Sequence, residues 1–424
     1  MFAQYKVSGG SGSPLLAESN NANKIDVYLL NGLLGAEISF TSSSSGTHQW
    51  YRYDQRATEA VPISSVQTGN TSVIRDVQSG YGYFVGSPLA PSTAYVWIVD
   101  YSKYVPVFHT IQAVEEEDKC EYLKIIADVE AEQINYRVPS GASVNLLRTY
   151  YLHYSTMKYE PDMSQFISKD TVVEWKGIIS ETVIAAPLEN TYFTLTGDKF
   201  AEHFGLASSI MSDMYTAIAV AIDKDVYTDK EHASNEKHQE ASAGNYGGSA
   251  PIEYTFTAIG NEPVAAFYIW KITEVDTITG QLNTIVRYTD KVLRYNFEKE
   301  GRYLVQLEVM DRNSTCVDSL KQPLSVVIGN TYLLLPNAFS PGSSIGVNDI
   351  YKVSYSSLLA FKASIYNRWG RLLYNWSDPS QGWDGRVNGK FVPTGVYYII
   401  VEYRGTDGKW RSKSSDINIL RSRN

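Results

Sequence analysis

The sequence has few of the side chains that most often carry chemistry. Its 424 residues include only two cysteines, six histidines and six methionines. Cys120 and Cys316 lie far apart, match no metal-binding spacing and make no disulfide framework. A bridge between them would require separate domains to fold back on each other. No uncharged apolar run reaches 18 residues, which excludes a membrane-spanning helix.

Charge is distributed unevenly along the chain. The formal net charge is −9. Residues 331–424 contain 12 Lys/Arg and 6 Asp/Glu, a net charge of +6, whereas residues 1–330 contain 25 and 40, a net charge of −15. The acidic body argues against nucleic-acid binding, which requires a broad basic face. A basic tail on an acidic body indicates two parts with separate tasks.

The first residues resemble the start of a processed chain. Met1–Gln4 has neither the positive region nor the apolar core of a signal peptide, but Ala3-Gln4 looks like the residue pair around a signal-peptidase cut. Gly9–Ser13 (GGSGS) then predicts a flexible leader over residues 1–24. We interpret the chain as a mature exported protein without its signal peptide. The alternative is a cytosolic protein that begins at Met1.

Residues 25–113 are predicted to form an immunoglobulin-like β-sandwich. The 32 tyrosines and the many Val, Ile, Thr and Ser residues favour strands. Alternating stretches occur at 25–28 and 36–40, and Trp50 stands where immunoglobulin-like folds keep their core Trp. Residues 76–83 resemble the approach to a tyrosine corner, in which a Tyr hydroxyl bonds back to the chain.

Residues 114–249 are predicted to form a second, β-rich domain. It begins at a solvated acidic joint, Glu115–Asp118. A short helix is expected at about 199–214. From 228 to 249 the chain is polar and predicts a linker or mobile loop.

Residues 250–330 are predicted to form a third sandwich. The phrase YNFEKEGRYLVQL (295–307) resembles the strand Y-x-x-x-G-x-Y-x-V-x-L of polycystic-kidney-type (PKD) domains. After Gly301, alternate residues of this phrase should point into the core. The resemblance is partial, because Trp270–Thr273 lacks the Gly-Asp-Gly of those domains. We therefore expect a mainly all-β protein with several Ig-like and PKD-like β-sandwiches in tandem.

From Leu335 onward, ordered motifs run through the tail. They are PNAFSP (336–341), VNDIY (347–351), IYNRWG (365–370), GWDG (382–385), NGK (388–390), PTGVYY (393–398) and INILR (417–421). Together they resemble the gliding-motility-associated C-terminal domain, the type B sorting domain of the Bacteroidetes type IX secretion system, over residues 331–424. The resemblance implies export to the cell surface or outer membrane. It also implies two partners, the type IX translocon and an outer-membrane barrel of the PorP/SprF type.

The same resemblance raises the question of a metal. The family usually writes its first loop as T-P-N-G-D-G-x-N-D, which looks like a calcium loop because closely spaced oxygens suit a hard cation. Here residues 340–349 are one residue longer and lack the central Asp. Asn348 and Asp349 are the remaining candidate ligands for Ca²⁺, and no other cofactor is expected.

The stretch IYNRWGRLLYNWSDPSQGWDG (365–385) is predicted to be a folding signature. Trp369 and Trp383 should be buried and hold the small domain together. Exposed cations beside them are the better candidates for recognising a partner: Arg368, Arg371, Arg386 and Lys390.

No catalytic residue is predicted. Gly342–Gly346 fits the pattern GxSxG but lies in a loop, not at a strand-to-helix turn. His232 and His238 match no metal-ligand spacing and predict a solvated loop. We expect a non-enzymatic scaffold or component of the secretion or gliding apparatus, and the lack of internal repeats favours this reading over an adhesin. The alternatives are a surface adhesin or glycan-binding protein, and an enzyme in residues 119–249.

Overall fold

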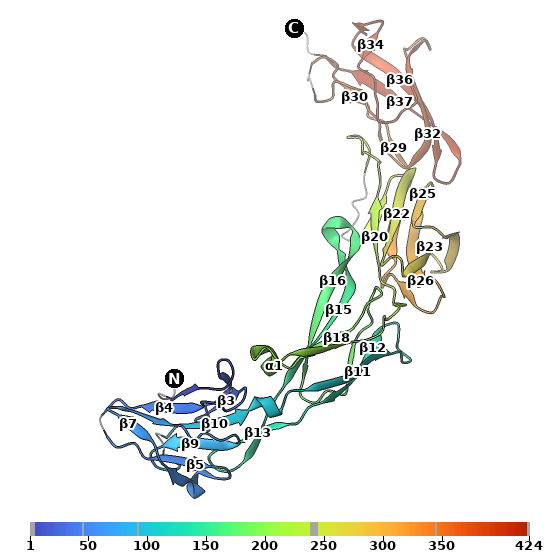
Figure 1. The fold of residues 1–424 in the computed structure, drawn as a ribbon. Coiled ribbons are helices and arrows are strands. Elements are labelled where there is room, and N and C mark those ends of the chain that lie inside the picture. The colour runs from blue at the N-terminus through green and yellow to red at the C-terminus, as the bar shows by residue number, and fades with distance from the viewer. Residues whose placement is uncertain (1–4, 45, 91–92, 238–244, 344–345, 422–424) are drawn as a thin grey trace. The chain divides into compact units, whose positions relative to one another are not determined.

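The chain folds almost entirely as β-strands. The computed structural model describes residues 5–44, 46–90, 93–237, 245–343 and 346–421. The chain divides into two compact units, Met1–Lys158 with Ser168–Ala217, and Tyr159–Ile167 with Ile218–Asn424. Figure 1 shows the strands of both units. Within the described ranges, no helix has the length and apolar character needed to cross a membrane.

The first unit begins with a two-sheet sandwich. One sheet has the order β1 (Tyr5–Ser8), β4 (Glu37–Thr41), β8 (Thr71–Ile74) and β7 (Val66–Thr68). The other has the order β2 (Leu15–Asn20), β3 (Ile25–Leu30), β10 (Tyr95–Asp100), β9 (Tyr81–Val85), β5 (Trp50–Tyr53) and β6 (Val61–Ile63). Trp50 is fully buried between them, and its indole N–H donates to the Ser72 hydroxyl over 2.8 Å. The predicted core role of Trp50 is confirmed.

The prediction of a flexible leader over residues 1–24 is wrong for residues 5–24, and residues 1–4 lie outside the described residues. Strand β1 pairs with β4, and β2 pairs with β3, so most of this segment completes the sandwich. The Tyr5 ring packs on Trp50, and its hydroxyl accepts the Val85 amide over 2.8 Å. Gly9 and Gly10 have positive φ and lie against the backbone of 31–36, where a Cβ would collide. The glycines therefore serve a tight turn.

The tyrosine corner predicted in the first sandwich is present. Tyr83 Oη accepts the Gln78 amide over 2.7 Å and donates to the Gln78 carbonyl over 3.3 Å. Burial raises the pKa of Tyr83 to about 12. The ring fills the core while the hydroxyl fixes the approach to β9.

The rest of the first unit contains three smaller sheets. Their orders are β11 (Val107–Val114), β12 (Tyr122–Glu130) and β17 (Glu181–Ala185); β13 (Ile134–Arg137) and β14 (Ser143–Leu146); and β16 (Gln165–Lys176), β15 (Thr149–Glu160), β18 (Thr194–Gly197) and β19 (Ser208–Met211). The helix predicted at 199–214 is only α1 (Lys199–His203). Gly205, with φ of 69°, follows its end, and the chain then enters β19.

Part of the segment that follows residue 113 shares a core with the first sandwich. Tyr136, Leu146 and Phe200 lie in one hydrophobic cluster with Val27 and Trp97 of the first sandwich. Because these side chains share one core, β13, β14 and α1 pack as extensions of the first sandwich.

A buried ion pair lies in this region. Arg148 is 5% exposed and Asp198 is fully buried, and Nη1 of the arginine donates to Oδ2 of the aspartate over 2.7 Å. Arg148 Nη2 also donates to the carbonyls of Tyr104 and Glu132, and the Tyr101 hydroxyl donates to Asp198 Oδ1 over 2.5 Å. Asp198 Oδ1 also accepts the first amides of α1, from Phe200 and Ala201. The pair therefore holds together α1, the link between β14 and β15, and the turn that follows β10.

We expect Arg148→Ala to destabilise the first unit strongly, because it leaves the Asp198 carboxylate buried without its cation. The local free energy of opening around residues 194–203 should fall by about 3–5 kcal/mol, measured by hydrogen exchange in urea. Arg75→Ala is the matched control, because Arg75 pairs with Glu37 at the surface and its loss should cost about 0–1 kcal/mol. Equal small effects in both variants would contradict the role of the buried pair.

The second unit contains the third sandwich. One sheet has the order β20 (Ile222–Tyr227), β22 (Ile252–Gly260) and β25 (Val292–Phe297). The other has the order β21 (Asn245–Gly248), β28 (Leu324–Ile328), β26 (Gly301–Asp311), β23 (Ala265–Val275) and β24 (Leu282–Tyr288), and β27 (Val317–Ser319) also pairs with β26. Strands β20 and β21 precede residue 250, so this sandwich starts earlier than predicted.

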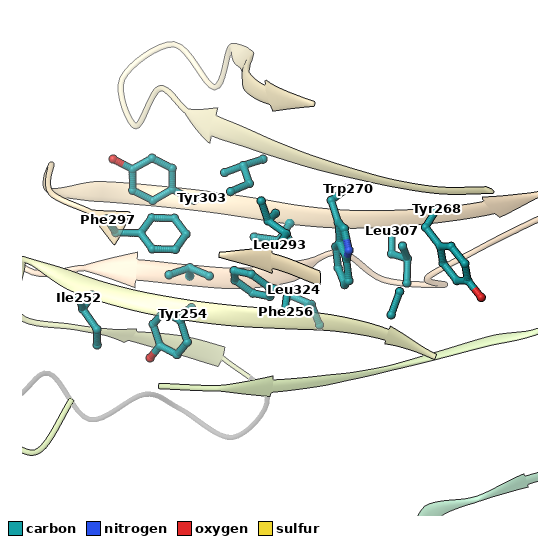
Figure 2. Close-up of a cluster of buried hydrophobic side chains, with 14 of the residues drawn as sticks. Ile252, Tyr254, Phe256, Tyr268, Trp270, Leu293, Phe297, Tyr303, Leu307 and Leu324 are labelled. Carbon is teal, nitrogen blue, oxygen red and sulfur yellow. The ribbon is translucent and has the colours of Figure 1, made fainter. Parts of the chain in front are cut away.

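The core of the third sandwich follows the predicted alternation. Tyr303, Val305 and Leu307 of β26 are at most 3% exposed. Figure 2 shows Tyr303 and Leu307 in the buried cluster with Trp270 and Phe297. The Tyr303 hydroxyl donates to the Lys299 carbonyl over 3.1 Å, which repeats the tyrosine corner of the first sandwich.

The C-terminal domain is a small sandwich of its own. Its main sheet has the order β30 (Ala338–Phe339), β37 (Trp410–Ile419), β36 (Gly395–Gly405), β32 (Leu358–Tyr366) and β33 (Leu372–Trp376). Two short sheets complete it, β29 (Tyr332–Leu334) with β31 (Ser354–Ser356), and β34 (Arg386–Val387) with β35 (Lys390–Phe391). The core residues of β36 are Tyr397, Ile399 and Val401.

The polar segment 230–237, which we call the clasp, is held against the C-terminal domain. The side-chain amide of Asn235 donates to the carbonyls of Val353 and Pro379, each over 2.8 Å. The Lys237 amide donates to the Tyr355 carbonyl over 2.7 Å. The prediction of a linker or mobile loop is therefore wrong for residues 230–237. Residues 238–244, with His238, lie outside the described residues.

A carboxylate stabilises the clasp. The side chain of Glu236 is 3% exposed, and its Oε1 lies 3.0 Å from Lys230 Nζ. Although burial alone raises the pKa of Glu236, hydrogen bonds from Ser249 and Lys230 outweigh it and hold this pKa below its ordinary value. His232 also faces the carboxylate, at 3.7 Å. These groups thus stabilise the charged form of the buried Glu236 carboxylate.

We expect Glu236→Ala to open the clasp and speed hydrogen exchange in residues 230–237, with a loss of about 1.5–3 kcal/mol for charged hydrogen bonds. Since the folded pKa of Glu236 is lowered, its contribution is complete at neutral pH and is lost as the pH falls through that lowered value. The variant should therefore differ from the parent at pH 7 and converge with it in acid. Glu231→Ala, which removes an exposed charge from the same segment, should change nothing.

Candidate functional site

A tightly bonded turn joins β32 and β33. Asn367 Oδ1 accepts the amides of Trp369 and Arg371, over 3.0 and 2.9 Å. Two main-chain hydrogen bonds close the turn. The Asn367 amide donates to the Arg371 carbonyl, and the Gly370 amide donates to the Asn367 carbonyl, each over 3.0 Å. Gly370 has φ of 77°, which suits a residue without Cβ. This turn, residues 367–371, is therefore ordered by its own sequence.

Trp369 and Trp383, both predicted to be buried, have opposite environments. Trp383 is fully buried beside Phe339 and Tyr397, and its indole N–H donates to the Arg386 carbonyl over 2.9 Å. Trp369 is 75% exposed, so its predicted burial is wrong. It lies at the tip of the turn, beyond the paired strands, and the core place on this hairpin is taken by Trp376.

The predicted cations are exposed and fall into two pairs. Arg368 and Arg371 lie in the 367–371 turn, and the Arg368 guanidinium lies over the Trp369 ring, 4.2 Å from its centroid. Arg386 and Lys390 lie on the β34–β35 hairpin, where Arg386 covers Phe391 at 4.3 Å and is 4.0 Å from Asp384. Among the described residues, neither Arg368 nor Arg371 has a carboxylate within ion-pair distance.

Both pairs lie at the same end of the domain. Gly405 and Thr406, at one end of β36, adjoin the third sandwich, because the Thr406 hydroxyl donates to Glu300 over 3.2 Å. The other end of β36 begins at Gly395, shortly after the β34–β35 hairpin, and Tyr398 pairs with Tyr366 at the edge of the 367–371 turn. We call this the distal end.

An apolar row extends from the turn across the outer face of the sheet. Leu372 pairs with Tyr366, and Tyr366 pairs with Tyr398, so the three side chains share one face. Leu372 and Tyr398 are each 47% exposed, and Val396 and Ile400 follow along β36 with 46% and 41%. This surface was not predicted from the sequence. The signal for it is the run VYYIIV, which is apolar at the positions that face outward as well as at those that face the core.

Comparison with known families bears directly on this domain. Residues 333–418 match the family model described as the CHU_C Type IX secretion signal domain. The C-terminal domain is a type IX secretion signal domain. Upstream, residues 112–212 match a fibronectin type III domain. The sorting domain predicted from the motifs is confirmed, and so is an Ig-like fold upstream of it.

Three of the solved structures that match this chain are the following. The N-terminal domains of the bacteriophage RB49 outer capsid protein Hoc are 11% identical, with coverage of 75% of this chain and 100% of that one and a TM-score of 0.22. Immunoglobulin domains 1–5 of Sidekick-1 are 10% identical, with coverage of 96% and 81% and a TM-score of 0.24. Latent PorU of Porphyromonas gingivalis is 11% identical, with coverage of 78% and 35% and a TM-score of 0.17. The curated proteins give no significant match.

The loop considered for Ca²⁺ in the secretion signal domain has one carboxylate, that of Asp349. Asp349 Oδ2 accepts the Gly346 amide over 3.1 Å, and the Asn348 carbonyl accepts the Ser340 amide over 2.7 Å. Ca²⁺ takes 6–8 oxygen ligands, so Asn348 and Asp349 could supply only part of such a site. Nowhere in the described ranges do three or more His, Cys, Asp or Glu gather in a metal-binding group. Ser344 and Ile345 of the GxSxG pattern lie outside the described residues.

The region considered for an enzyme holds one cluster of suitable side chains. His153, Ser155 and Asp170 line an open pocket of about 420 Å³. Ser155 donates directly to Asp170 over 2.9 Å, while His153 bonds to the Thr196 hydroxyl over 3.1 Å. A nucleophile triad needs the His between the other two. The observed arrangement is different.

The contrast between the two tryptophans leads to a stability test. Trp383→Ala should lower the free energy of unfolding of the secretion signal domain by about 3–5 kcal/mol, because it removes a fully buried ring. Trp369→Ala should change it by less than about 0.5 kcal/mol, as for other surface substitutions. Urea unfolding of the full chain, followed by hydrogen exchange in β36, measures both. A large loss in Trp369→Ala would show that this side chain supports the fold.

Proposed function

We propose that this protein is a non-enzymatic component of the cell envelope, delivered by the type IX secretion system. Its secretion signal domain docks on an outer-membrane barrel of the PorP/SprF type, and the upstream sandwiches act as a scaffold within the secretion or gliding apparatus. The observation that carries the proposal is the secretion signal domain with four exposed cations at its distal end.

Charge supports a docking role for the tail. The secretion signal domain concentrates positive charge, whereas the rest of the chain is acidic. Complementary charge accelerates and orients encounters with a partner. Because the distal end lies away from the contacts with the third sandwich, its cations can approach a partner without disturbing those contacts.

A glycan-binding adhesin is the second candidate. The exposed rings of Trp369 and Tyr398 favour it, since aromatic faces stack on sugars as readily as on protein groups. An enzyme has less support, because the His153, Ser155 and Asp170 side chains are not arranged as a triad.

Co-purification with point variants tests the docking role. The full chain should recover the barrel from detergent-solubilised outer membranes. Arg368→Glu with Arg371→Glu, or Arg386→Glu with Lys390→Glu, should lower that recovery about tenfold at low salt, and less so at high salt, because rim charges act at long range. Truncation before Thr331 is a poorer test, because it also removes the partner of the clasp.

The matched control reverses two cations elsewhere in the same domain. Lys362→Glu with Lys409→Glu makes the same change in net charge away from the distal end, and recovery should stay near that of the parent. Failure of the parent chain to recover any barrel, combined with saturable binding to purified surface polysaccharide, would favour the adhesin instead.

A further inference from the structure

We infer that Trp369, with Arg368 stacked on its ring, is the anchor of the docking surface. It would enter an apolar pocket with an acidic rim on the barrel partner. This inference rests on the proposed function and names the contact on which docking depends.

The Trp369 side chain is exposed and its backbone is fixed. The ring is 75% exposed, and the core position on this hairpin is occupied by Trp376. The turn that carries Trp369 is closed by two hydrogen bonds to the Asn367 side chain and two between main-chain groups. A group held this way loses little conformational freedom on binding, which favours affinity. Trp and Arg are also the side chains most enriched where binding energy concentrates.

The surface around the anchor is apolar with a polar border. The row Leu372, Tyr366 and Tyr398 starts where the turn ends, and Val396 and Ile400 extend it along β36. Ser414 and Asp416 of β37 pair with Ile400 and Tyr398 and give the row a polar border. A central apolar area with a polar border is the usual composition of a protein-binding patch.

The charge around Trp369 selects the kind of partner. Arg368 and Arg371 flank the ring, and no carboxylate among the described residues pairs with either of them. A partner that covered Trp369 with neutral groups alone would leave both guanidiniums uncompensated at the edge of an apolar contact. Carboxylates on the partner would compensate the charges of both guanidiniums. The Arg368 guanidinium also covers the Trp369 ring, at 4.2 Å, which makes the ring a poorer platform for a neutral sugar.

Trp410 provides an internal comparison. It is 63% exposed on the same sheet, but it pairs with Arg404 near the end of the domain that adjoins the third sandwich. Along β36, Arg404 is six residues from Tyr398, a distance of about 20 Å at the rise of a strand. One variant at each Trp therefore separates the anchor from the general effect of losing an exposed aromatic ring.

The experiment is a quantitative pull-down of the outer-membrane barrel by the purified full chain. Trp369→Ala should weaken binding at least about tenfold, the scale of a hot-spot residue. Trp369→Phe should restore part of it, and Trp410→Ala should bind like the parent. A second measurement places a photo-reactive phenylalanine analogue at position 369 or 410, and the barrel should cross-link from 369 only.

The outcomes separate the two proposals. If the parent chain recovers the barrel but Trp369→Ala and Trp410→Ala bind equally well, the anchor is wrong while the proposed function stands. If the parent recovers no barrel, the proposed function fails and the anchor fails with it. If purified surface polysaccharide binds in a manner that Trp369→Ala abolishes, and barrel recovery is unchanged by that substitution, the surface is a glycan site and the protein-docking inference is overturned.

Discussion

Three of the sandwiches each depend on a tyrosine corner, in which a buried Tyr ring bonds through its hydroxyl to the backbone. Tyr83, Tyr303 and Tyr397 each fill a sandwich core and bond through the hydroxyl to a backbone carbonyl four or five residues upstream. Such a bond satisfies a buried polar group and fixes the corner through which the chain enters a central strand. These three buried tyrosines thus have a structural role, and an exposed aromatic side chain needs a different explanation.

Alternation in the sequence predicted the sandwich cores well, but not the features that depend on contacts distant in the chain. Trp50, Tyr303 and Trp383 could be placed because a turn residue and a period of two determine which way each side chain points. Trp369 could not, since the same local pattern fits a buried ring and a ring at the tip of a turn. Trp369 lies outside the core because the hydrogen bonds of Asn367 close the turn at residues 367–371, beyond the paired strands.

The clasp shows a second limit of local pattern. Residues 230–237 are polar, which predicts a solvated loop. In the structure, Asn235 donates to the main chain of the C-terminal domain, and Glu236 pairs with Lys230. Composition alone does not distinguish polar groups that face water from polar groups that satisfy one another. The helix predicted at 199–214 was also too long. It ends before Gly205, and the chain that follows forms β19, which pairs with β18.

The secretion signal domain thus has two ends with different physical tasks. At one end, Ser357 exchanges hydrogen bonds with Ser249 and Ala250, and Thr406 bonds to Glu300, so the domain is fixed to the third sandwich. At the distal end, a rigid turn displays apolar and cationic groups.

An exposed apolar face is a liability for a soluble protein, because it promotes non-specific association. The distal end limits that liability in two ways, since Arg368 covers one part of the Trp369 ring and polar residues of β37 border the apolar row. Both features lower the tendency of the surface to associate non-specifically, and neither covers it completely. This combination suits a surface that stays free until a complementary partner covers it.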